Sequence, residues 1–304
     1  MRSTVPGASL WILAAIFVAI APIQAHAQAC PPSGHTKGSL QSLRSQKFVL
    51  PTIEIKRALA DGLLACLASP DPELRDEIAY EALTHWMRSG DFDDATLRSI
   101  RDRLYAMLDR DPGAGFSQPF AALVLSEVAR TDRVAPRTGW MSSAERAAMV
   151  ERAATFVESV RDYRGYVNGE GWRHGVAHGA DWLMQLALNP ALERTHHDRI
   201  LAADATQAVP ERGHAYVFGE PGRLARPVLF VAARRLMSPD EWKTWFASLV
   251  TRLGKPADDY AAWLARRHDL AAFFSAVYVE TDLSEDANVR ALNSVAAEAV
   301  KAVR

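Results

Sequence analysis

The chain has 304 residues, and its 35 Lys and Arg nearly balance its 36 Asp and Glu, so the formal net charge is −1 with histidine neutral. Bulk electrostatic binding of nucleic acid relies on clustered Lys and Arg, so we expect no nucleic-acid partner. A mature chain of about 275 residues is long enough for one domain of stacked helices.

The first residues have the pattern of an export signal. Arg2 gives a positive start, residues 10–23 are apolar except for Pro22, and Ala25-His26-Ala27 supplies the small-x-small pattern that signal peptidase reads. The apolar stretch is short for a membrane span, which needs about 20 residues, although an uncleaved anchor is the alternative. We expect residues 1–27 to be a signal peptide and the mature protein to be periplasmic or secreted, without a membrane span.

The chain has only two cysteines, Cys30 and Cys66. In an oxidising compartment they would form a disulfide that ties the mature N-terminus to the first helix. The alternative is a buried Cys66 thiol beside a Cys30 in a mobile tail, and spacing alone does not decide between the two. We expect no lipid anchor at Cys30, because the preceding residues lack the usual aliphatic side chain. Residues 28–50 are expected to be a flexible N-terminus, and residues 51–304 one domain.

From Ile53 onwards the sequence predicts one helix after another, because apolar residues recur every three or four positions. The first helix is expected over residues 53–67. Asp71-Pro72 starts the next, whose apolar stripe reaches Trp86. Two further stripes run over residues 97–108 and 120–128.

Two capping boxes mark the starts of later helices. Ser142-Ser143-Ala144-Glu145 opens one, and Ser238-Pro239-Asp240-Glu241 repeats the spacing with proline at the first helical position. The last helices are expected through Trp263, over residues 270–279 and from Ser284 to the C-terminus. Strand patterns are absent. About twelve helices with short joints predict an all-α fold of stacked antiparallel helix pairs, an α-solenoid-like (HEAT- or armadillo-like) single domain.

The segment 171–181 carries the most chemical information. If it is helical, His174, His178 and Asp181 fall within roughly 60° of one another, since each residue adds about 100°. Two imidazoles and a carboxylate on one face suit a divalent metal such as zinc. The zincin motif is excluded, because Gly175 stands where that motif has its catalytic Glu. A metal site, a metal-free polar site and a core seam all stay open, since the small neighbouring residues also permit close helix packing.

Two polar loops are expected beside this face. Residues 162–171 are rich in glycine and run into the helix that Trp172 opens, and a helix N-terminus of this kind readily binds anions or carboxylates. In the segment 212–223, Glu220 and Arg223 would complete the site or would form an ion pair of little energetic weight at a helix start. The other candidate site residues are Asp162, Tyr163, Arg164 and His214.

These residues resemble the bacterial domain-of-unknown-function family 2785. The resemblance is densest over residues 162–167 and over Gly171-Trp172-x-His174-x-x-x-His178-Gly179-Ala180-Asp181. Weaker matches lie at Leu74-Arg75-Asp76, Ala79-Tyr80, Trp86, Phe120-Ala121-x-Leu123 and Gly219-Glu220-x-x-Arg223-Leu224-Ala225. The resemblance implies an all-helical, repeat-like fold and the location of a site, but no established activity. Arg173 and Gln118-Pro119 depart from the pattern, which has a small residue at the first place and a basic residue at the second.

The sequence therefore leads to two functions of different classes. In one, a divalent metal held by His174, His178 and Asp181 activates a water molecule for hydrolysis. In the other, the helical stack is a non-catalytic scaffold that binds a small molecule, a peptide or a cell-envelope partner. A histidine cluster that only stabilises the core is a third interpretation. No residue pattern identifies a substrate.

Overall fold

The computed structural model describes residues 29–256 and 259–304. The expected signal peptide, residues 1–27, lies outside the described residues. Among the helices that the structure describes, none combines the length and the hydropathy that a bilayer-spanning segment requires.

The N-terminal part consists of short helical segments. They are α1 (Lys37–Ser45), α2 (Ile53–Leu63), the 3-10 helix η1 (Leu64–Ala68), the π-helix η2 (Glu73–Tyr80) and α3 (Glu81–Arg88). The predicted helix over residues 53–67 is thus split after Leu63. The segment expected to be flexible, residues 28–50, contains α1, whose Leu40 is fully buried. This short amphipathic helix was not predicted from the sequence.

A disulfide joins Cys30 to Cys66, so of the two alternatives that spacing left open, the structure has the bridge. Cys66 is fully buried in η1, and the bridge therefore ties the N-terminal arm to the core. Beside it, Pro32 packs directly on Gly62, where a Cβ atom would lie 2.8 Å from the Cβ of Pro32.

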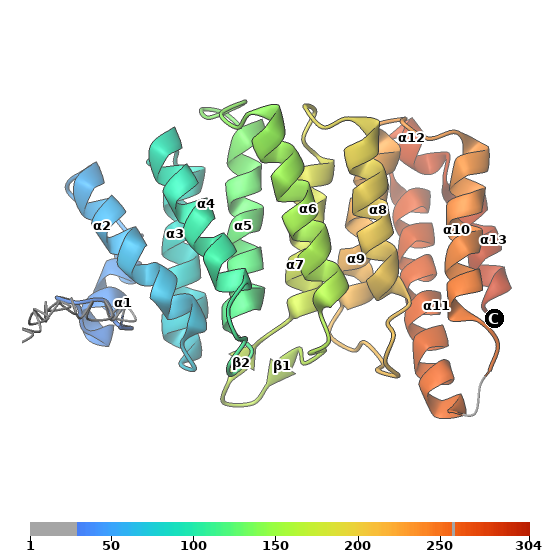
Figure 1. Cartoon of the computed structure of the whole chain (residues 1–304), viewed down its shortest axis with the longest axis horizontal. Coiled ribbons are helices and arrows are strands. Elements are labelled where there is room, and N and C mark those ends of the chain that lie inside the picture. Colours follow the sequence, from blue (N-terminus) through green and yellow to red (C-terminus); the bar gives the residue numbers. More distant parts are fainter. Residues whose placement is uncertain (1–28, 257–258) are drawn as a thin grey trace, which may run out of the picture.

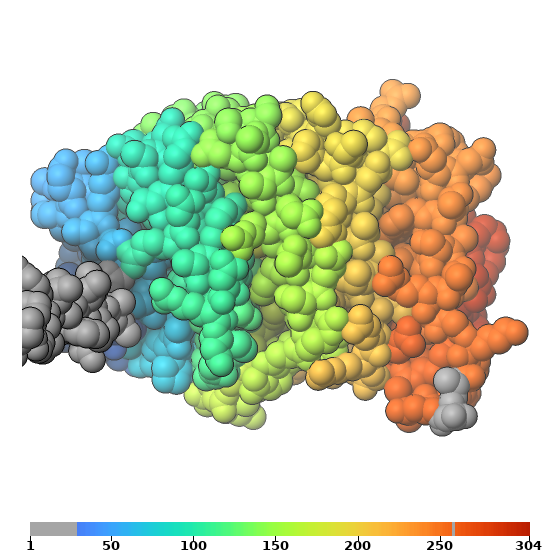
Figure 2. Space-filling view, in the orientation of Figure 1, coloured from blue at the N-terminus to red at the C-terminus, as the bar shows by residue number. Residues whose placement is uncertain are grey.

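From α4 onwards, longer helices lie in two rows (Figure 1). Helices α5, α7, α9 and α11 pack against one another in chain order, and α4, α6, α8 and α10 lie in front of them in this view. The colour bands of Figure 2 follow the sequence along the long axis of the molecule. The chain is one all-α domain. The helices are α4 (Asp94–Leu108), α5 (Ser117–Arg133), α6 (Ser143–Ser159), α7 (Gly175–Ala187), α8 (Arg194–Ala208), α9 (Glu220–Ala233), α10 (Pro239–Leu253), α11 (Tyr260–Leu283), α12 (Ala287–Arg290) and α13 (Asn293–Ala302).

Both predicted capping boxes are confirmed. The hydroxyls of Ser142 and Ser238 accept hydrogen bonds from the backbone N–H groups of Glu145 and Glu241, whose carboxylates bind the N–H groups of the serines. The helices predicted around Trp263 and over residues 270–279 are a single helix, α11, because neither glycine nor proline separates them. The segment after Ser284 is divided into α12 and α13.

Among the described residues, one pair of strands interrupts the helices. Strand β1 (Tyr166–Val167) pairs antiparallel with β2 (Gly171–Trp172), and Tyr166 lies opposite Trp172. The sequence did not predict these strands, because two residues are too few for an alternating pattern. Gly169 and Gly171, at φ 81° and 78°, supply left-handed backbone conformations that favour glycine. The hairpin connects α6 to α7 in the sequence and lies beside the lower ends of the helices in the view of Figure 1.

Candidate functional site

His174 lies outside the helix that the sequence predicted for it. Helix α7 begins at Gly175, and His174 is its N-cap, with φ 56° and ψ 38° in the left-handed region. Such a conformation costs a residue with a Cβ about 1–2 kcal/mol. Two backbone hydrogen bonds stabilise this conformation. The N–H of His174 donates to the carbonyl of Arg164, and the carbonyl of His174 accepts from the N–H of His178. The prediction that the three side chains share one face of a helix therefore holds for His178 and Asp181 but not for His174.

Glu220, the first residue of α9, is the partner of His174. Its Oε1 lies 3.6 Å from Nε2 of His174, and its Oε2 accepts a 2.9 Å hydrogen bond from the N–H of Phe218. Burial raises the pKa of Glu220, but the interactions with His174 and with backbone N–H groups outweigh burial and hold the pKa below its usual range. The buried carboxylate is therefore ionised at neutral pH.

His178 is a neutral, buried imidazole. Its Nδ1 lies 3.2 Å from the carbonyl oxygen of Pro119, so Nδ1 carries the proton of this neutral ring. Phe120 packs against the ring edge-on. Burial, together with electrostatic interactions with His174 and Arg223, lowers the pKa of His178 to about 3. The ring is therefore poorly suited to proton transfer at neutral pH, which needs a pKa close to the working pH.

Asp181 is bound from α9 by arginine side chains. Nη1 of Arg223 donates to its Oδ2, and Nη1 of Arg226 lies 3.8 Å from its Oδ1. Burial raises the pKa of Asp181, and both guanidinium groups oppose that effect. The structure thus brings Glu220 and Arg223 of the second polar segment against His174 and Asp181 of the first.

The three predicted metal ligands do not converge. Among the described residues, no group of three or more His, Cys, Asp and Glu side chains is arranged to hold a metal ion. The proton on Nδ1 of His178 is directed at Pro119, and the two guanidinium groups at Asp181 would repel a divalent cation.

Three exposed aromatic side chains form a cluster that contacts His174 through Trp172. Trp172 stacks on its ring with centroids 4.7 Å apart, and Tyr166 and Phe218 contact Trp172 edge-on at 5.2 and 5.9 Å. We call Tyr166, Trp172 and Phe218 the aromatic lip. The sequence reading missed Tyr166 and Phe218. Tyr166 could have been identified from a predicted hairpin, because the strand register places it opposite Trp172.

Tyr163 and His214 belong to a different cluster. Their rings stack with centroids 5.3 Å apart, and both contact Tyr216. The N–H of Tyr216 donates to Asp269, a fully buried residue of α11 that the sequence reading missed. Burial raises the pKa of Asp269 to about 7. Tyr163 and His214, which were predicted to belong to the site, therefore pack in this cluster and not against His174.

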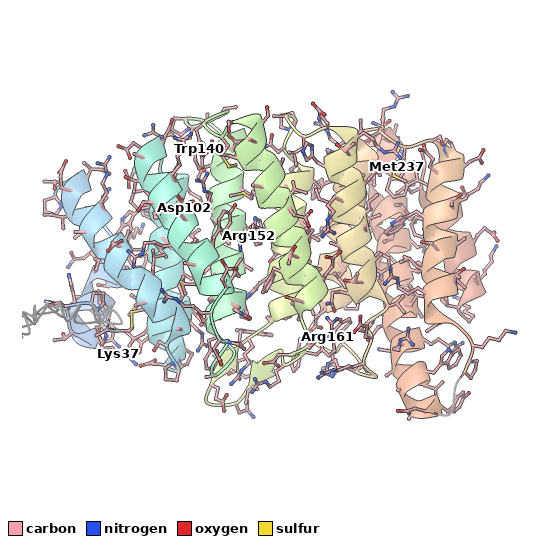
Figure 3. The ribbon with its side chains drawn as sticks, viewed as in Figure 1. Lys37, Asp102, Trp140, Arg152, Arg161 and Met237 are labelled. Carbon is pink, nitrogen blue, oxygen red and sulfur yellow. A yellow bond between two sulfur atoms is a disulfide. The ribbon has the colours of Figure 1, made fainter. Side chains whose placement is uncertain are left out.

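Asp162 and Arg164 line a cavity of about 520 Å³ at the foot of α5, α6 and α7. Figure 3 labels Arg161, which also lines this cavity, near the lower ends of the helices, on the side of the molecule where the hairpin lies. We call this space the basic cavity. The remaining lining residues are Pro112, Gly113, Gly115, Gln118, Pro119, Phe156, Ser159, Val160, Gly175 and Arg212.

The charges of the basic cavity are unbalanced. Its three arginines face one aspartate, which leaves a net charge of +2. Arg164 pairs with Asp162, and Arg161 pairs with Glu211 outside the lining. In the part of the chain that the structure describes, the guanidinium of Arg212 makes no hydrogen bond or ion pair.

Two helices begin at the basic cavity without a side-chain cap. They are α5, whose first turn contributes Gln118 and Pro119, and α7, which contributes Gly175. The backbone N–H groups of a first helical turn have no partner within the helix and carry a partial positive charge. Gly115, at φ 86°, lies so close to Asp162 and Arg164 that a Cβ atom would be 2.8 Å from the carboxylate.

The two departures from the family pattern have structural roles nearby. The side-chain amide of Gln118 donates to the carbonyls of Leu108 and Arg110 and so holds the loop before α5. Arg173 is buried, donates to the carbonyl of Ala114, and lies over the ring of Phe116 at 4.2 Å.

Arg75 also packs on the ring of Phe116. The fully buried Arg75 lies over Phe116 at 4.1 Å and donates to the carbonyl of Glu170 in the hairpin at 2.9 Å. The segment before α5 and the hairpin are therefore joined through buried guanidinium groups.

A family model described as a protein of unknown function (DUF2785) matches residues 104–279. The matched segment is more than half of the chain and includes His174, Glu220 and the whole basic cavity. No curated protein and no solved structure matches the chain.

Proposed function

Because this chain belongs to the DUF2785 family, whose description assigns no activity, we propose its function from its own geometry: it is a non-catalytic binding protein whose basic cavity holds an anionic ligand. The observation that carries the proposal is the meeting of three arginines and two uncapped helix starts around one cavity.

The size and charge of the cavity support this proposal. Its volume of about 520 Å³ is within the range of roughly 300–1,000 Å³ that small-molecule sites occupy. Helix N-termini attract anions, and arginine binds carboxylate and phosphate groups through paired hydrogen bonds. Among the described residues, Arg212 makes no side-chain hydrogen bond or ion pair that an anion would have to replace. The ligand class that fits is a small molecule with a carboxylate or a phosphate, and the free carboxylate of a peptide has the same chemistry.

Metal-dependent hydrolysis has less support. It would need His178 and Asp181 to turn away from Pro119 and from Arg223. Proton transfer without a metal has no strong candidate beside the cavity either, because the His178 ring stays neutral and the carboxylate of Asp162 is bound by Arg164.

We also propose that the two rows form an α-solenoid-like stack and that the protein is exported. The chain-order packing of α5, α7, α9 and α11 supports the first proposal. The Cys30–Cys66 disulfide supports the second, since disulfides persist mainly in oxidising compartments.

Isothermal titration at low ionic strength tests the anion site. The probes are inorganic phosphate, citrate and succinate, and succinamide is the uncharged counterpart of succinate. We expect the anions to bind and succinamide not to bind. The Arg212→Ala variant should bind at least about tenfold more weakly, since a hydrogen bond to a charged group contributes about 1.5–3 kcal/mol and about 1.4 kcal/mol corresponds to a factor of ten.

The control is Arg252→Ala, which removes the same charge from an exposed arginine of α10 that does not line the cavity. If no anion binds, or if both variants weaken binding equally, the proposal is wrong. Binding should also weaken as salt is added, because exposed charges are screened.

A further inference from the structure

The basic cavity also has an apolar side, which the anion proposal does not use. Pro119 lies in the first turn of α5, and Gly175 begins α7. Phe156 and Val160 lie one turn apart at the end of α6. All four residues line the cavity, and we call them the apolar wall.

The apolar wall is closely packed. A Cβ atom at Gly175 would lie 3.4 Å from Cγ1 of Val160 and 3.7 Å from Cγ of Pro119. The ring of Phe156 lies against the next turn of α7, where a Cβ atom at Gly179 would be 3.2 Å from Cε1 of that ring. A wall that is ordered before a ligand arrives loses little conformational entropy on binding.

Charged groups of the basic cavity border the apolar wall. Nη1 of Arg161 donates a 2.9 Å hydrogen bond to the carbonyl of Val160, so this guanidinium lies beside the wall. A Cβ atom at Gly115, which also lines the cavity, would be 2.8 Å from Oδ2 of Asp162 and 3.0 Å from Nη2 of Arg164. The cavity therefore presents apolar and charged surfaces to the same ligand.

We infer that the ligand of the basic cavity is an amphipathic acid, a small molecule that carries an apolar group next to its carboxylate or phosphate. This inference rests on the proposed function, which requires only the acidic group. Inorganic phosphate would leave the apolar wall in contact with water, and a wholly apolar ligand would desolvate the arginines without pairing them. An acid with an apolar group matches both surfaces.

Isothermal titration of the full chain with matched pairs of acids tests the inference. The pairs are hexanoate with acetate, hexyl phosphate with methyl phosphate, and N-acetylleucine with N-acetylglycine. Burial of one methylene group strengthens binding about three- to fourfold, so the acid with the larger apolar group should bind at least about tenfold more tightly in one pair or more. The pair with the tightest binder identifies the source as a free carboxylic acid, a phosphate ester or the C-terminal residue of a peptide.

Two substitutions separate the apolar wall from the charges. Gly175→Ala adds a methyl group at ordinary contact distance from Val160 and Pro119. It should weaken binding of the larger acid about fourfold more than binding of the smaller one, because the methyl group takes space that a ligand methylene would fill. Arg212→Ala should weaken binding of both acids by the same factor, since it removes charge and leaves the wall intact.

The matched control is Gly222→Ala on α9. Gly222 does not line the cavity, and among the described residues a Cβ atom there would meet no other atom within 4 Å. This variant should bind every acid as the parent chain does. Near-ultraviolet circular dichroism of each variant checks that the fold is kept.

The outcomes distinguish the inference from the proposed function. If acids bind but the larger acid is no tighter than the smaller one in all three pairs, the inference is wrong and the anion site stands. If no acid binds, or if uncharged hexanamide binds as tightly as hexanoate, the proposed function fails and the inference fails with it. Equal effects of Gly175→Ala and Gly222→Ala on the larger acid would contradict the role of the apolar wall.

Discussion

The carboxylate of Glu220 lies 3.6 Å from Nε2 of His174, although the two residues begin different helices. Each helix is preceded or capped by a left-handed residue, His174 for α7 and Gly219 for α9. The contact therefore fixes the starts of two adjacent helices relative to each other. It also joins the two polar segments that the sequence shows as separate.

Replacing Glu220 with glutamine tests the electrostatic part of this contact. The lowered pKa of Glu220 means that its ionised form stabilises the fold above the unfolded pKa, about 4.3, and that this contribution is lost as the pH falls through the lowered folded pKa. At neutral pH, Glu220→Gln should lower the free energy of unfolding by about 1–3 kcal/mol. Urea unfolding should show this difference in free energy shrinking as the pH falls below about 4.3. A difference that is constant with pH would contradict this assignment.

The buried imidazole of His178 predicts a loss of stability in mild acid. Its pKa is about 3 in the folded chain, against about 6.5 when it is unfolded. The unfolded state therefore takes up a proton first, and the folded state loses up to about 1.4 kcal/mol per pH unit below about pH 6.5. His178→Gln should remove this part of the pH dependence. In a nuclear magnetic resonance titration, a His178 midpoint near its unfolded value would show the assignment to be wrong.

Two glycines of α7 provide a matched pair for the packing of this helix. At Gly179 a Cβ atom would lie 2.7 Å from Cγ2 of Val157 on α6, whereas at Gly175 the nearest atom would be 3.4 Å away. Gly179→Ala should therefore lower the free energy of unfolding by about 1–3 kcal/mol through overpacking, and Gly175→Ala should have a much smaller effect. Urea unfolding of both variants measures the contrast, and equal effects would argue against close packing at Gly179.

Removing the disulfide should destabilise the chain. The bridge between Cys30 and Cys66 spans 36 positions, and a loop of that length gives a chain-entropy contribution of about 4 kcal/mol. Urea unfolding of a variant with both cysteines replaced by serine, compared with the oxidised and the reduced parent chain, measures the effect. The variant and the reduced parent should agree, and a reduced parent as stable as the oxidised one would contradict the expectation.

Metal removal should leave the protein unchanged. Because Asp181 is bound by Arg223 and Nδ1 of His178 by Pro119, we expect untagged protein to contain no stoichiometric metal. Its melting temperature should not shift with a chelator, since only a metal bound to the folded state raises it. If the protein contained stoichiometric zinc and both His174→Ala and His178→Ala lost it, the result would contradict this prediction and support the metal site that the sequence predicts.

Much of the helical fold could be predicted because it rests on local patterns. The capping boxes at Ser142 and Ser238 depend on hydrogen bonds within four residues, and both were identified correctly. The apolar stripe of residues 97–108 likewise corresponds to α4. The capping boxes and the apolar stripe are reliable predictors because the residues that form each pattern are close together in the same helix.

The candidate site was harder to predict because it depends on contacts between distant segments. Nothing in the local sequence shows that His174 adopts a left-handed conformation or that Arg223 reaches Asp181. The adjacent pair His196-His197 shows the same limit. Its two polar side chains suggest a solvated loop, yet His197 is fully buried, with its ring nitrogens 2.9 and 3.3 Å from the carbonyls of Glu193 and Ala187.

The buried guanidinium of Arg75 shows that the boundary of the family match is not a boundary of folding. Arg75 lies before the matched segment, yet it packs on Phe116 and holds the carbonyl of Glu170, 95 positions later, in the hairpin. A fragment trimmed to residues 104–279 would lose one of the two guanidinium groups that pack on the ring of Phe116 and would leave the carbonyl of Glu170 without its donor. The hairpin that contains Trp172 thus depends on the N-terminal helices, and the unit that must be expressed together is larger than the segment that the family model matches.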